Sequence, residues 1–162
     1  MNIDRLRLIF EYNTWANQRI LAAAEKLSSE QLKAPNELGW GSLHGMLVHI
    51  LDAEYGWRRY LADRAETPLL EAEDFDDLAA IARRWAEEDD ALRRYLDRLG
   101  DDDLDGLVDY EVDGEARYHI LWHCLYHMVN HGTQHRSECA ALLTGFGASP
   151  GDMDFTVFLG QR

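Results

Sequence analysis

Five of the seven histidines in the chain lie in one short stretch, HILWHCLYHMVNHGTQH, over residues 119–135. They recur at every fourth position, which is close to one turn of an α-helix. Two imidazoles one turn apart have Cβ atoms about 6 Å apart and can bind the same divalent ion. The spacing therefore indicates a candidate metal site. The alternative is that these histidines lie on a solvated helix face or pack in the core without binding an ion.

The direction in which each histidine points depends on the helix that carries it, which we predict over residues 115–144. A helix turns about 100° per residue, so histidines at every fourth position drift about 40° per step and cannot share one face. On this helix His119 and His123 lie about 160° from the apolar stripe, whereas His131 and His135 lie about 80° and 40° from it. His131 and His135 are thus the pair expected to face the interior.

Another helix offers candidates for a third ligand. The segment HILDAEYGW belongs to a helix predicted over residues 42–65, with the serine at its start as N-cap. His49 lies at the edge of the apolar stripe of this helix, and Glu54 lies about 20° from the stripe centre. A buried carboxylate is costly unless it is paired, hydrogen-bonded or near a cation. Glu54 and Arg136 are therefore our candidate catalytic residues. Glu54 orients a ligand imidazole, binds the ion itself or pairs with Arg136.

Three neutral imidazoles with an open fourth position are typical of catalytic metal sites. An ion in such a site polarises a substrate atom or lowers the pKa of bound water. Zinc and nickel both accept imidazole, so the ligand type does not decide between them. The sequence contains no Glu-x-x-His di-iron motif, no glycine-rich phosphate loop and no G-x-S-x-G elbow.

Long helices must position these residues. The segment over residues 101–117 holds turn residues around a short alternating piece, which is either irregular or a small hairpin. Four long helices joined by modest loops predict an all-α four-helix bundle with a short C-terminal helix. A chain of 162 residues fits a single domain over residues 1–162. Helical periodicity predicts helices over residues 2–26, 42–65, 75–99, 115–144 and 152–159.

The charge of the chain limits its partners. Against 30 acidic side chains there are 16 Lys and Arg, and the net charge of −14 repels phosphate backbones and anionic lipid surfaces. The start, MNIDRLRLIF, carries charges where a signal peptide needs its apolar segment, and no apolar run approaches membrane-spanning length. We therefore expect a cytoplasmic protein that binds neither nucleic acid nor a membrane.

The sequence resembles the DinB family, the DinB/YfiT-like metalloenzymes, over nearly the whole chain. The resemblance rests on four segments in order, YNTWANQRIL, HILDAEYGW, LYHMVNHGTQHR and PGDMDFTVFL. It implies that His49, His131 and His135 bind a divalent metal in an up-down-down-up four-helix bundle that commonly forms homodimers. Where family members often read His-Arg-Gly-Gln, this chain reads His-Arg-Ser-Glu from residue 135.

The resemblance also suggests an activity. Characterised relatives include S-transferases and isomerases that use a low-molecular-weight thiol. It therefore implies a metal-dependent enzyme acting on a small-molecule substrate, with thiol transfer as the leading reaction and metal-assisted hydrolysis second. The alternative to an enzyme is a non-catalytic, metal-stabilised dimer that acts as a binding module. A metal-free helical domain with an accidental run of histidines is the third interpretation.

Overall fold

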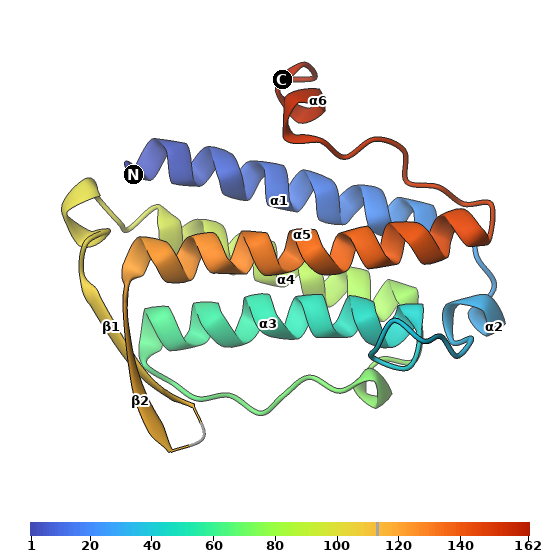
Figure 1. The fold of residues 1–162 in the computed structure, drawn as a ribbon, viewed down its shortest axis with the longest axis horizontal. Coiled ribbons are helices and arrows are strands. Elements are labelled where there is room, and N and C mark those ends of the chain that lie inside the picture. Colours follow the sequence, from blue (N-terminus) through green and yellow to red (C-terminus); the bar gives the residue numbers. More distant parts are fainter. Residues whose placement is uncertain (113) are drawn as a thin grey trace.

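Helices dominate the chain. A computed structural model describes residues 1–112 and 114–162. Within these residues four long α-helices lie side by side, and two short ones and a small sheet accompany them (Figure 1). The mostly helical fold is thus confirmed, and no described helix combines the length and apolar character needed to cross a bilayer. The helices are α1 (Ile3–Ala24), α2 (Ser29–Leu32), α3 (Leu43–Asp63), α4 (Leu78–Leu96), α5 (Leu121–Gly145) and α6 (Phe155–Leu159), with 3-10 turns η1 (Ala72–Asp74) and η2 (Asp101–Asp103).

Polar side chains set where the long helices begin. Ser42 is the N-cap of α3, as expected, and its Oγ accepts the backbone N–H of Gly45 at 3.1 Å. Asn2 caps α1 and Asp77 caps α4 through the same kind of bond, at 2.9 and 2.8 Å. Each cap satisfies a backbone donor that the first turn leaves without an intrahelical partner. At the other end of α3, Arg64 adopts a left-handed φ of 51° and ends the helix.

The long helices bury their apolar stripes against one another. α1 packs against α4 and α5, and α3 packs against the same two helices. The buried apolar residues fall into two clusters at different levels along the helices. One cluster includes Ile20, Leu47, Ile81 and Leu143; the other includes Phe10, Leu92, Leu104 and Leu125.

A β-hairpin precedes α5. Strand β1 (Leu107–Val112) pairs with strand β2 (Glu115–Ile120) as antiparallel neighbours, with Leu107 opposite Ile120. The sequence left an irregular segment and a hairpin as alternatives here, and the structure forms the hairpin. It extends away from the bundle on the side where α3 ends and α5 begins (Figure 1).

The hairpin corrects one prediction. α5 begins at Leu121 and not at residue 115, so His119 lies on β2 and is not part of the helical series. Asp113 lies outside the described residues, but an Asp-Gly pair in the sequence is typical of a two-residue hairpin turn. Gly114 has the positive φ, 79°, that such turns favour. The helix was predicted from residue 115 because the four-residue spacing of the histidines continues back to His119.

The chain ends in a short helix that covers α1. α6 is shorter than the expected helix over residues 152–159, and its Phe155 and Phe158 rings contact α1. Both rings meet Tyr12 edge to face, with centroids 5.3 and 5.9 Å away. Tyr12 also donates a hydrogen bond to the Met153 carbonyl at 3.0 Å, which ties the C-terminal segment to α1.

Candidate metal centre

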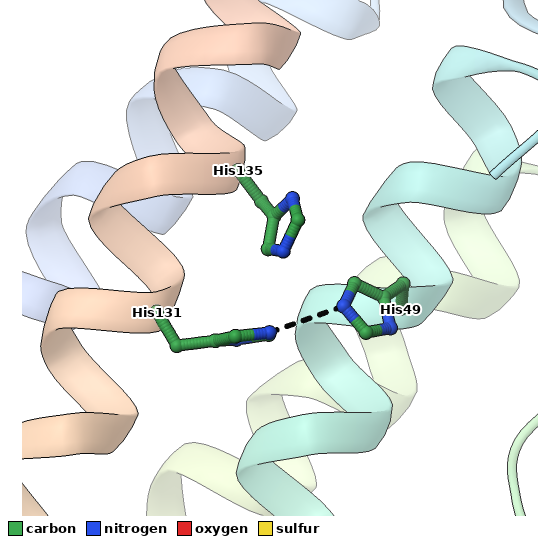
Figure 2. A group of neighbouring side chains, drawn as sticks. All are labelled: His49, His131 and His135. Carbon is green, nitrogen blue, oxygen red and sulfur yellow. Dashed lines mark hydrogen bonds between the residues drawn. The ribbon is translucent and has the colours of Figure 1, made fainter. Parts of the chain in front are cut away.

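Three histidines from two helices meet at one point. His49 comes from α3, and His131 and His135 come from α5 (Figure 2). One ligand nitrogen from each ring lies within 4.8 Å of the other two. The Nε2 atoms of His49 and His131 are 3.1 Å apart, whereas four-coordinate zinc, with bonds of about 2.0–2.1 Å, spaces its ligand nitrogens roughly 3.3 Å apart. The donor set therefore fits a divalent ion, and the α5 pair selected by direction is the pair that faces α3.

An indole ring covers His49. The Trp40 ring stacks on the imidazole with centroids 3.5 Å apart and an interplanar angle of 11°. Trp40 itself has a left-handed φ of 53°, between Gly39 and Gly41 with φ of 101° and 71°. A Cβ at position 45 would collide with the Trp40 carbonyl oxygen, so Gly45 allows this loop to lie close to α3. This stacking was not predicted from the sequence, because a loop residue leaves no periodic signal.

Glu138 orients His135. The His135 Nδ1 lies 2.7 Å from Oε2 of Glu138, one turn further along α5. A carboxylate that accepts one ring N–H fixes the tautomer and leaves Nε2 available to an ion. This role was not predicted from the sequence, although the His-x-x-Glu spacing on a helix places the two side chains next to each other.

Replacing Glu138 by alanine is expected to weaken metal binding about 10–100-fold, because His135 loses the carboxylate that orients it. Glu138→Gln keeps a hydrogen-bond acceptor without the charge, so its metal affinity should lie between those of the wild type and Glu138→Ala. Competition with a chelating dye measures the affinity, and Glu87→Ala, at an exposed position on α4, is the matched control. An affinity unchanged in Glu138→Ala would show that the contact does not tune the site.

Burial keeps two of the three imidazoles neutral. It lowers the pKa of His49 to about 4, and the neighbouring His131 and His135 rings add to the effect. Burial likewise lowers the pKa of His131 to about 4, with further contributions from His135 and His127. Neutral rings offer a nitrogen lone pair, so at neutral pH these two histidines bind an ion without first releasing a proton.

The contribution of His49 and His131 to the metal affinity is therefore expected to be lost as the pH approaches 4, where both rings take up protons. The free energy of unfolding of the metal-free protein also decreases as the pH falls. The folded-state pKa values lie below the unfolded value of about 6.5, so this stability is complete above that pH and is lost as the pH falls toward 4. Calorimetric titrations with zinc between about pH 7 and about pH 4 test this. A large loss already complete near pH 6 would contradict it.

Glu54 lies in a buried polar network. Only 1% of its surface is exposed. Its Oε1 accepts hydrogen bonds from the side-chain amides of Asn13 and Asn17 at 2.7 and 3.0 Å, and its Oε2 accepts the Trp85 indole N–H at 2.8 Å. Arg136, which is 2% exposed, donates from Nη1 to the amide oxygens of the same two asparagines at 2.6 and 2.8 Å. Of the roles left open for Glu54, these contacts match the pairing with Arg136, bridged by Asn13 and Asn17.

This network stands directly behind the triad. Arg136 follows His135 on α5, and its charge contributes to the lowered pKa of His131. Gly132 gives the guanidinium its room, because a Cβ there would lie 2.6 Å from Arg136 Nη1 and 3.2 Å from Asn13 Oδ1. The network thus joins α1, α3, α4 and α5 at the level of the three histidines.

Comparison with protein families finds a match over almost the whole chain. The model of the DinB family matches residues 1–161. The match includes α3 and α5, which supply the three histidines, and α1, which supplies the asparagines of the network. A search of curated proteins finds no match to the chain.

Proposed function

Because the chain belongs to the DinB family, we propose that it is a metal-dependent enzyme whose centre is formed by His49, His131 and His135. The observation that carries the proposal is the convergence of three imidazoles from α3 and α5. Zinc or nickel suits these ligands. When bound, the ion would supply Lewis-acid chemistry that lowers the pKa of a thiol or of water.

The chain's own residues prepare the site. Stacking on Trp40 restrains the His49 ring, and the hydrogen bond to Glu138 restrains His135. A cavity of about 400 Å³ has Trp40 and His49 in its wall, and this volume suits a small-molecule substrate. Glu54 and Arg136 are almost fully buried and are hydrogen-bonded through the asparagines. We therefore assign both of them a positioning role behind the triad.

The proposed reaction is thiol transfer. The sulfur of a low-molecular-weight thiol forms a bond to an electrophilic carbon of the substrate, the bond from that carbon to its leaving group breaks, and the thiol proton passes to solvent. Metal-assisted hydrolysis is the second candidate. The resemblance to thiol-dependent relatives supports the first, and the cavity beside the triad supports either. In the test, model electrophiles are mixed with several cellular thiols, and model esters are assayed in parallel.

The expected result is turnover that disappears with a chelator and in His131→Ala, and that persists in the control His123→Ala. His123 lies on the same helix in an exposed position. If no thiol or ester substrate turns over while the chelator lowers the melting temperature, the alternative is favoured, a metal-stabilised module without catalysis.

We also propose for the four long helices the up-down-down-up order implied by the family. The connection between α3 and α4 supports this order, because residues 64–77 run back along α3 before α4 begins (Figure 1). Homodimer formation and a cytoplasmic location stay predictions. Sedimentation analysis tests the first, with a species of twice the chain mass as the expected result.

A further inference from the structure

A second cavity lies beside the one that borders the triad. Its volume is about 410 Å³, and α3, the connection that follows it and β1 contribute its walls. It shares Asp52 and Leu69 with the cavity that contains Trp40 and His49. The two cavities are therefore neighbours along α3, and the one that contains Trp40 borders the triad at His49.

Three aromatic rings line this second cavity: Trp57 and Tyr60 from α3, and Tyr110 from β1. The rings of Trp57 and Tyr110 have centroids 5.2 Å apart and are nearly perpendicular, at 77°. The Tyr60 hydroxyl donates to the Asp109 carbonyl at 2.6 Å, which fixes that ring beside β1. All three rings are half-buried, and the faces of Trp57 and Tyr110 point in different directions because the two rings are nearly perpendicular.

The charged residues of the cavity are all acidic. Asp52, Glu66 and Glu111 line it, and among the described residues in its walls there is no Lys or Arg. The Asp52 carboxylate is held in place by the Leu70 N–H at 2.8 Å. Arg64 approaches the Tyr60 ring, at 5.7 Å from its centroid, but its guanidinium is bound by the carbonyl and carboxylate of Asp109 outside the cavity lining.

We propose that this cavity binds an organic ammonium group, and that the rest of the bound molecule extends along α3 toward the neighbouring cavity beside His49. Aromatic faces attract cations through the negative charge of the ring surface, and the attraction grows when water is excluded. The three carboxylates add a Coulombic attraction of the same sign. The extension toward the triad rests on the proposed function, whereas ammonium binding does not.

The test compares two probes of the same shape, choline and its uncharged analogue 3,3-dimethylbutan-1-ol. Binding to the full chain is followed by NMR titration of the Trp57 indole signal, which is assigned from the signal lost in Trp57→Phe. In the variant that lacks this indole, binding is followed by the choline methyl signal instead. Choline is expected to bind about 3–30-fold more tightly than the alcohol, as expected for a cation over aromatic faces. The preference should persist in His131→Ala, so a failure of the proposed enzyme function leaves this result intact.

Variants of the cavity separate its two contributions. Trp57→Leu should weaken choline binding about 3–30-fold, whereas Trp15→Leu, a half-buried tryptophan on α1, should leave it unchanged. The double variant Glu66→Gln/Glu111→Gln changes only exposed residues and should weaken choline binding without affecting the alcohol. Equal binding of the two probes, or choline binding unaltered in the folded double variant and in Trp57→Leu, would overturn the proposal.

Discussion

Replacing His131 or His135 by alanine is expected to abolish stoichiometric metal binding, with a loss of affinity of at least about 1000-fold. Removing one of three imidazoles leaves two, and two imidazoles hold zinc only weakly. The wild-type chain, purified without a histidine tag, should contain one ion per chain after dialysis, and each variant should contain none. Elemental analysis measures both contents directly.

His123→Ala is the matched control for this experiment. His123 lies on α5 two turns before His131, is exposed and does not belong to the converging group. Its replacement should leave one ion per chain. If the two triad variants kept the wild-type metal content, the histidines would not be the ligands. If no preparation of the wild type held an ion, the chain would be a metal-free helical domain.

The second large effect is expected on stability. Glu54→Ala should lower the free energy of unfolding by about 3–5 kcal/mol, because it leaves Arg136 buried without its counter-charge. It also removes the acceptor for two amides and an indole N–H, each of which is costly to bury unpaired. Denaturant unfolding measured at neutral pH gives this difference.

Two control variants show whether the loss of stability comes from the buried network around Glu54 and Arg136. Glu87→Ala replaces an exposed glutamate on α4 and should change the free energy of unfolding by less than about 0.5 kcal/mol. The double variant Glu54→Met/Arg136→Met removes both charges and should recover the part of the loss that comes from leaving Arg136 without its counter-charge. A Glu54→Ala protein as stable as the wild type would mean that the network contributes little.

The sequence determines most of the helical framework because the relevant signals are local. Ser42 and the periodic apolar residues after it predict where α3 begins, and its side chain forms the expected cap. The direction of each histidine on α5 selected His131 and His135, since that direction depends only on helix geometry. His49 required the resemblance to the family, because its position at the edge of an apolar stripe is ambiguous.

Other features depend on contacts between segments that are distant in sequence. Trp40 reaches His49 through a loop with positive φ angles, which periodicity cannot predict. Asn13 and Asn17 lie on α1, and only the packing of α1 against α5 reveals that they bridge Glu54 to Arg136. Asparagines in an apolar stripe were the available signal, since buried amides need partners.

The start of α5 shows how two local signals can compete. The four-residue spacing of the histidines favours a helix through His119, whereas the Asp-Gly pair before it favours a hairpin turn. Cross-strand pairing of β1 with β2 decides in favour of the hairpin. This correction leaves the triad unaffected, because His131 and His135 lie well inside α5.

X-ray absorption spectroscopy of the zinc-loaded protein tests the central claim most directly, because it reports the type, number and distance of the atoms around the ion. The account predicts three imidazole nitrogens at about 2.0–2.1 Å and no sulfur. A sulfur neighbour at about 2.3 Å, or a shell with fewer than three imidazoles, would contradict a centre built from His49, His131 and His135.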